Sequence, residues 1–176
     1  MIKFLVTLKQ KDLSAVSSEQ ILRSNPITID GEAIQLKAID RFQLIYVNGE
    51  HVQQQQLLTL IKDSYIFSNP NKHHLIFSEN LSRLNQHSYY VKVSRKQPIN
   101  LSGSVTKLNS MLDSGAVTNV HVSDIWSVRL DQKIEPESVT QHLAISSNDA
   151  IGIFAHPLVH DVETLEFNDF ANYLNA

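Results

Sequence analysis

The chain has 176 residues, a formal net charge of −3 and 42% hydrophobic residues. This length allows either one medium-sized domain or two small ones of roughly 80 residues each. The chain has no cysteine, which excludes disulfides, thiolate metal sites and a cysteine nucleophile. Its small negative charge leaves no excess of cations to neutralise phosphates, so we expect no nucleic-acid binding.

The N-terminal residues Met1 to Val6 predict a strand rather than a signal peptide, because a charged residue follows within three positions. No apolar run approaches the ~20 residues that a membrane span requires. We therefore expect a cytoplasmic protein with no membrane-spanning segment.

In the first half of the chain, apolar residues alternate along 4–8 and predict a half-buried strand. Apolar residues at helical spacing from Val16 to Leu22 then predict a helix. A second helix is expected over 52–66, where Gly and Pro are absent and apolar residues share one side. Leu75 to Phe77 predicts a last strand.

Between these two helices, stretches rich in β-branched and aromatic residues predict a hairpin. The stretches are 34–39 and 42–47, with Asp40-Arg41 as the expected turn. The second half shows the same pattern over 117–122 and 125–130, with Ser123-Asp124 as the turn.

The rest of the second half follows the same order of elements. Tyr89 to Val93 alternate as a strand, and Val105 to Leu112 predict a helix that Gly115 would end. A second helix is expected to begin near Pro136, a favourable first-turn residue, and a last strand covers 162–167.

An internal repeat explains this agreement. Ile66-Phe67-Ser68-Asn69-Pro70 matches Ile153-Phe154-Ala155-His156-Pro157, and Leu13-Ser14 matches Leu101-Ser102. The separations from Ser14 to Pro70 and from Ser102 to Pro157 agree to within one position. Chance similarity between two ordinary α/β segments is the alternative interpretation.

We therefore expect an α+β fold of two tandem βαββαβ units that form a pseudo-dimer. Its sheet is expected to be antiparallel or mixed, with helices on one face. The expected units are residues 1–80 and 88–176, joined by a polar linker at 81–87, and residues 170–174 fit either a short helix or a frayed tail.

Several segments resemble the PurS family, the non-catalytic subunits of phosphoribosylformylglycinamidine synthase. Val6-Thr7-Leu8-Lys9 is similar to the end of the family's first strand, and Ile39-Asp40-Arg41-Phe42 to its hairpin turn, with Asp40 in place of Gly. Ile66 to Pro70 resembles the family's helix-to-strand junction, and the second copy has His156 in place of its Asn. The whole arrangement resembles the N-terminal region of the large fused synthase, which is similar to two PurS units joined end to end.

The resemblance implies an adaptor in de novo purine biosynthesis that is not itself an enzyme. Such a subunit joins a PurQ-type glutaminase to a PurL-type synthetase, so that ammonia passes between them. ATP, Mg and glutamine would be used by those partners, and this chain would bind no cofactor and would be a pseudo-dimeric monomer or a homodimer. The expected partner interface contains Arg41, Phe42, Asn69, Pro70, Trp126, His156 and Pro157. Core positions remain open for Trp126, and turn-capping roles for Asn69 and His156.

The sequence shows no pattern typical of catalysis or metal binding. The few glycines form no phosphate-binding loop, and no serine lies in a nucleophile-elbow pattern. His73 and His74 are adjacent on a strand, so their side chains point to opposite faces. Two alternatives share the same order of elements: a tandem small-molecule-sensing regulatory module, and an RNA-binding module that would use Phe42 and Tyr46 for stacking.

Overall fold

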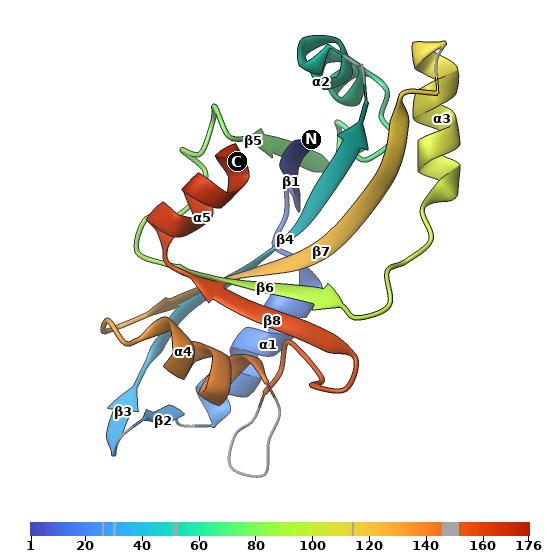
Figure 1. Ribbon diagram of the computed structural model, residues 1–176. Helices are drawn as coiled ribbons and strands as arrows, with labels where there is room; N and C mark the ends of the chain where they lie inside the picture. The colour runs from blue at the N-terminus through green and yellow to red at the C-terminus, as the bar shows by residue number, and fades with distance from the viewer. Residues whose placement is uncertain (26, 30, 51–52, 114, 146–151) are drawn as a thin grey trace.

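The computed structural model of this protein describes residues 1–25, 27–29, 31–50, 53–113, 115–145 and 152–176. The main sheet has six strands in the order β5-β1-β4-β7-β6-β8, and every neighbouring pair is antiparallel (Figure 1). The strands are β1 (Ile2–Leu8), β4 (Leu36–Gly49), β5 (His73–Phe77), β6 (Tyr89–Arg95), β7 (Val117–Leu130) and β8 (His160–Leu165). The fold is therefore α+β, as expected.

The two central strands, β4 and β7, are continuous over 14 residues each, so the predicted hairpins are wrong. They pair with one another from Leu36 opposite Leu130 to Gly49 opposite Val117. The dipeptides expected to turn lie inside this ladder, where Arg41 Nη2 donates to Asp124 Oδ1 at 2.8 Å. Both dipeptides stay extended because each pairs with the long strand of the other half of the chain instead of forming a local turn.

The main-sheet strands of the two halves of the chain follow one another and pair in the same order. β1 lies between β4 and β5, and β6 lies between β7 and β8. Val6 pairs with Gln43, Val93 pairs with Asp124, and Gln43 and Asp124 pair with each other. A position in β1 thus has an equivalent in β6, and a position in β4 has one in β7.

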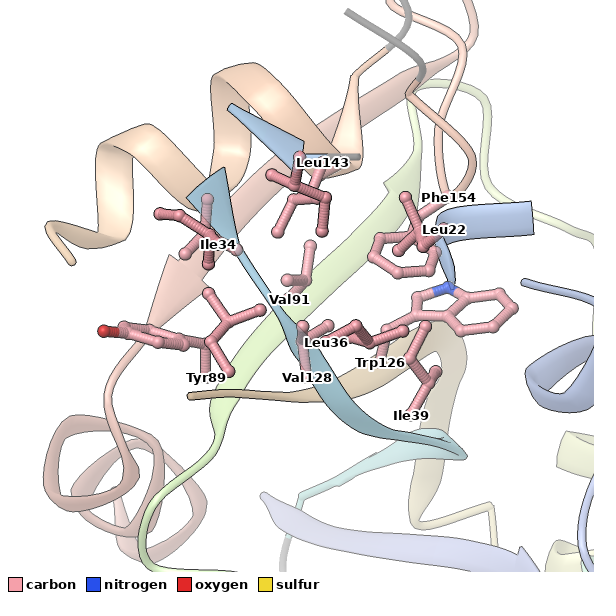
Figure 2. Packing of buried hydrophobic residues seen from close by; sticks show 14 of the residues in the cluster. Leu22, Ile34, Leu36, Ile39, Tyr89, Val91, Trp126, Val128, Leu143 and Phe154 are labelled. Carbon is pink, nitrogen blue, oxygen red and sulfur yellow. The ribbon is translucent and has the colours of Figure 1, made fainter. Parts of the chain in front are cut away.

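One face of the sheet, the helical face, is covered by helices in two groups (Figure 1). The helices are α1 (Leu13–Ser24), α2 (Gln54–Asp63), α3 (Ser102–Leu112) and α4 (Pro136–Val139), which continues into the π-helical turn η1 (Thr140–Ala144). α2 and α3 cover a core around Phe4 and Val47, whereas α1, α4 and η1 cover a core around Val91 and Val128 (Figure 2). Each core therefore contains helices from both halves, because β4 and β7 run from one core into the other.

The opposite face, which we call the α5 face, is defined by the buried side chains of Leu5, Phe42, Leu44, Tyr90 and Ile125. α5 (Phe167–Asn175) lies on it through Phe170 and Leu174, and Leu84 of the connecting segment joins the same cluster. Tyr90 and Phe170 stack with ring centroids 4.4 Å apart. The expectation that all helices share one face is therefore wrong for α5, because the strands carry apolar residues on both faces.

The starts of α1 and α4 follow local sequence signals. Asp12 caps α1 by accepting from the backbone N–H groups of Ser14 and Ala15 at 2.8 and 3.2 Å. α4 begins at Pro136, as predicted. α3 ends at Leu112, and the left-handed residue that caps it is Asp113, with a φ of 49°, and not Gly115.

Other boundaries differ from the predictions by a few residues. α2 is shorter than expected and covers Gln54–Asp63, and Val52 lies outside the described residues. β5 and β8 each begin two residues earlier than predicted.

A small hairpin of β2 (Ile27–Ile29) and β3 (Glu32–Ile34) was not predicted. Its signal is the Asp30-Gly31 pair between alternating residues, and Gly31 has a φ of +83° that favours glycine.

Candidate functional site

Arg41 and Trp126, two of the predicted partner residues, meet at the middle of the helical face. They are directly opposed in the β4–β7 ladder, and the guanidinium carbon lies 5.4 Å from the indole centroid. Arg41 Nη1 also lies 3.8 Å from Asp12 Oδ2, at the start of α1. Arg41 thus ties α1 to both long strands, and its side chain is half-buried rather than exposed in a turn.

Trp126 is a core residue. Its side chain is buried and stacks on Phe154, with ring centroids 4.6 Å apart (Figure 2). Two buried nitrogens at this centre, Arg41 Nε and Trp126 Nε1, have no hydrogen-bond partner among the residues that the structure describes. The cation–π contact between the Arg41 guanidinium and the Trp126 ring replaces part of the stabilisation that these missing hydrogen bonds would give.

Phe42 lies on the other side of the sheet. We expected it in an exposed turn, and this is wrong: it is buried under Leu84 and α5 on the α5 face. An extended strand places neighbouring residues on opposite faces, so Phe42 cannot share a surface with Arg41.

The Asn69-Pro70 and His156-Pro157 junctions form the same hydrogen-bonded turn at opposite edges of the sheet. The backbone N–H of Asn69 donates to His73 Nδ1 at 2.9 Å, and that of His156 donates to His160 Nδ1 at 3.1 Å. The carbonyl oxygens of Asn69 and His156 accept from the N–H groups of His73 and His160 at 2.8 and 2.9 Å.

Each junction is also tied to its neighbouring strand in the same way. Lys9 N donates to Lys72 O at 2.8 Å in one half, and Lys96 N donates to Val159 O at 2.9 Å in the other. The proline residues of both junctions are exposed.

The seven predicted interface residues therefore do not form one site. Arg41 and Trp126 hold the centre of the helical face, Phe42 packs on the α5 face, and the two junctions lie at the two outer strands.

A different site, absent from the sequence predictions, lies on the α5 face beside the end of α5. It is a cavity of about 250 Å³, which we call the β6 pocket. Its walls include Tyr46 and Asn48 of β4, Lys92 and Ser94 of β6, and His121 and Ser123 of β7. Arg95, Pro98 and Ile99 line it where β6 ends, and Met1 and Val122 also contribute.

Hydrogen bonds between side chains organise the β6 pocket. Ser94 Oγ and Ser123 Oγ lie 2.9 Å apart across β6 and β7. Lys92 Nζ donates to Glu163 Oε2 on β8 at 2.7 Å, and the Asn119 amide nitrogen lies 2.8 Å from His121 Nε2. The Arg95 guanidinium makes no hydrogen bond or ion pair within the described part of the chain.

A tyrosine and lysine cluster separates the pocket from α5. The hydroxyl groups of Tyr46 and Tyr173 are hydrogen-bonded, and Lys3 and Lys92 lie 4.3 and 4.6 Å from the Tyr173 ring centroid. Lys3 Nζ also donates to the Tyr173 carbonyl at 2.7 Å, in the last turn of α5 where carbonyls lack helical partners. These contacts fix the C-terminal turn of α5 against β1, β4 and β6.

The protonation of this cluster follows from its burial. Burial, and next the hydrogen bond with Tyr173, raises the pKa of Tyr46 above its ordinary value. Burial also raises the pKa of Tyr173. Burial, and then the charge of Lys92, lowers the pKa of Lys3. The tyrosines therefore remain neutral donors at physiological pH, next to two clustered cationic groups.

Sequence alternation offered a partial signal for the β6 pocket. Once Tyr89, Val91 and Val93 are assigned to the core, Lys92 and Ser94 must face the other way. The contribution of β4 and β7 depends on which strands become neighbours, and this cannot be read from one strand.

Among the described residues, no group of three or more His, Asp or Glu side chains could hold a metal ion. None of the helices in these ranges is both long and apolar enough to cross a membrane. Comparison with known protein families, with curated proteins and with solved structures gives no match to this chain. What the protein does has therefore to be inferred from its own residues.

Proposed function

We propose that this chain is a non-catalytic adaptor of the PurS type. In this proposal it joins a PurQ-type glutaminase to a PurL-type synthetase in phosphoribosylformylglycinamidine synthase, within cytoplasmic purine biosynthesis. The observation that carries the proposal is the equivalent wiring of the two halves, which meet at the Gln43–Asp124 pair of the β4–β7 ladder. This wiring supports two PurS-like units joined as a built-in pair.

The junction segments give the proposal its second support. The Asn69-Pro70 and His156-Pro157 turns carry the resemblance to PurS, and both show the same backbone contacts. Identical contacts at separate edges are expected when two copies of one unit keep one structural element.

The shared sheet suits an adaptor physically. Two catalytic partners exchange ammonia only if their active sites stay aligned, which requires a rigid body between them. Continuous strands through both cores resist hinge motion, since bending would break the ladder of backbone hydrogen bonds. Covalent connection also replaces a bimolecular encounter by an effective concentration of order mM.

The exposed junctions are the proposed contact surface. Leu158, next to Pro157, is 81% exposed, which is unusual for leucine and suits a residue that a partner covers. Phe42 and Trp126 are buried and serve the fold in this proposal, while Arg41 holds the two long strands together.

Affinity capture tests the adaptor role. The chain is immobilised and offered a PurQ-type glutaminase and a PurL-type synthetase, with glutamine, ATP and Mg present. We expect both to be retained, and we expect Leu158→Arg to weaken retention. Leu13→Arg is the matched control, because Leu13 is also 81% exposed but lies at the start of α1. If neither partner is retained by the unmodified chain, the adaptor proposal is wrong.

The small-molecule-sensing alternative is favoured by one observation, the β6 pocket, which is open to solvent and lined by polar side chains. The RNA-binding alternative loses its stacking surface, because Phe42 is covered by Leu84 and α5. A regulatory module would show a thermal shift with its ligand and would retain neither catalytic partner.

A further inference from the structure

The β6 pocket combines polar walls with an otherwise apolar sheet face. The neighbouring positions on the α5 face, Leu44, Tyr90 and Ile125, are buried and apolar. The pocket positions Lys92, Ser94 and Ser123 are polar, although Ser123 is buried. Burying a polar group is costly unless it has partners, so a row of such groups beside an apolar cluster suggests a binding role.

The charge of the pocket is positive, in contrast to the chain as a whole. Lys92 and Arg95 contribute to its walls, and within the described part of the chain no Asp or Glu lines it. Glu163 neutralises part of the Lys92 charge from β8, but Arg95 has no such partner in the described ranges. The lowered pKa of Lys3, caused by burial and then by Lys92, is consistent with a local excess of positive charge.

The donors in the pocket suit an anion that accepts several hydrogen bonds. The Ser94 and Ser123 hydroxyls are adjacent, and hydroxyl groups can rotate to donate to a ligand. A guanidinium presents a planar fork of donors that matches carboxylate and phosphate oxygens. Arg95 lies at the end of β6, beyond the last β6–β7 pair at Val93, and lines the pocket together with Ser94. Its guanidinium makes no hydrogen bond or ion pair among the described residues, so it is available for this contact.

The size of the pocket limits the ligand. Its volume of about 250 Å³ lies below the ~300–1,000 Å³ that is common for drug-sized ligands. A nucleotide or a peptide would not fit, whereas a small metabolite with one or two charged groups would.

We infer that the β6 pocket binds the oxyanion group, phosphate or carboxylate, of a small metabolite through Arg95, Ser94 and Ser123. His121 and Asn48 lie on the same wall and orient the rest of the molecule. This inference does not depend on the adaptor proposal, because it concerns the α5 face and not the junctions at the sheet edges.

The equivalent place in the first half carries apolar residues instead of this polar row. Leu5 of β1 is equivalent to Lys92, and Phe42 of β4 is equivalent to Ser123. Both first-half residues are buried beneath α5 and Leu84. Both equivalent positions thus carry apolar residues in the first half, where α5 covers the sheet, and polar residues in the second half, where the pocket is open to solvent.

Titration with inorganic phosphate, and separately with acetate, tests the inference. Amide chemical shifts of the full chain are recorded at constant ionic strength, with chloride as the reference anion. We expect saturable shifts confined to 92–99 and 119–124 with at least one of the two probes. The probe that saturates at the lower concentration identifies the group as phosphate or carboxylate.

Variants then separate a built site from general attraction to cations. We expect Arg95→Gln to weaken binding at least tenfold, and Ser123→Ala to weaken it severalfold. Arg83→Gln is the matched control, since Arg83 is an exposed arginine of the connecting segment without an ion pair among the described residues. Arg95 is also exposed, so its variant is expected to fold, and unchanged shifts elsewhere verify this. The inference is overturned if neither probe saturates, if chloride gives equal shifts, or if Arg95→Gln binds as the unmodified chain does.

Discussion

The two halves of the chain share one wiring, yet they use equivalent positions on the α5 face in opposite ways. In the first half, Leu5 and Phe42 are buried beneath Leu84 and α5. In the second half, Lys92 and Ser123 line an open pocket. Equivalent backbone positions therefore do not determine whether a side chain is apolar or polar. The segments that cover the sheet, Leu84 and α5, determine which positions belong to the core and which are available to a ligand.

Exchange of the Leu5 and Lys92 side chains tests this contrast most strongly. Leu5 is fully buried, so Leu5→Lys would place an unpaired charge in the core and cost more than about 4 kcal/mol of unfolding free energy. Lys92→Leu is expected to change stability by no more than about 1 kcal/mol, because its ion pair is partly exposed.

Urea denaturation of both variants measures the difference. Should Leu5→Lys fold into a chain within about 1 kcal/mol of the unmodified protein, the first half is not closed as described.

Truncation of Phe42 and of Ser123 probes the same contrast through packing. Phe42→Ala removes a buried ring and should cost about 3–5 kcal/mol. Ser123→Ala removes one hydrogen bond to Ser94 and should cost about 1 kcal/mol. Denaturation midpoints give both values, and equal losses in the two variants would contradict the proposed division between core and pocket.

Alkaline titration compares a tyrosine buried beneath α5, Tyr90, with one beside the pocket, Tyr46. Burial raises the pKa of Tyr90 to about 12 beneath α5, and the pKa of Tyr46 is raised beside the pocket. The folded chain keeps these protons when the unfolded chain has lost them near pH 10, so the stability they contribute is complete below pH 10 and is lost above it. Lys3 acts in the opposite direction, because its lowered pKa makes stability rise with pH before 10.5.

Tyrosinate absorbance, recorded with and without denaturant, follows this titration. We expect delayed ionisation in the folded chain, and a smaller delay in Tyr46→Phe. Ionisation of all tyrosines near pH 10 in the folded state would contradict the burial of Tyr90 and Tyr46.

Substitutions in the two junctions are expected to change stability least. Here the two halves of the chain should respond in the same way. Asn69 Oδ1 accepts from the Asn71 N–H at 2.9 Å, and His156 Nδ1 accepts from the Leu158 N–H at 3.3 Å. Alanine at either position should cost about 0.5–1.5 kcal/mol, with the larger loss at Asn69 because its bond is shorter. Thermal denaturation measures both, and a loss at one junction alone would show that the turns are not equivalent.

Local pattern predicted much of the fold, because strands and helices follow from side-chain spacing. The alternation of Tyr89 to Val93 and the start of a helix at Pro136 are confirmed. The Asp30-Gly31 signal would also have predicted the β2–β3 hairpin.

The central strands could not be predicted in the same way. Asp40-Arg41 and Ser123-Asp124 are compatible with a turn and with an extended strand, and the choice depends on a partner far away in sequence. The Arg41–Asp124 ion pair and the β4–β7 ladder supply that partner. For the same reason, a pocket whose walls come from β4, β6 and β7 is visible only after these strands are neighbours.

The continuous course of β4 and β7 also decides how the protein melts. Each of these strands has one end in each core, so neither core can come apart without loosening the strand that the other core depends on. Two small modules connected by a tether would show separate heat-absorption peaks, whereas this arrangement should unfold as a single cooperative unit.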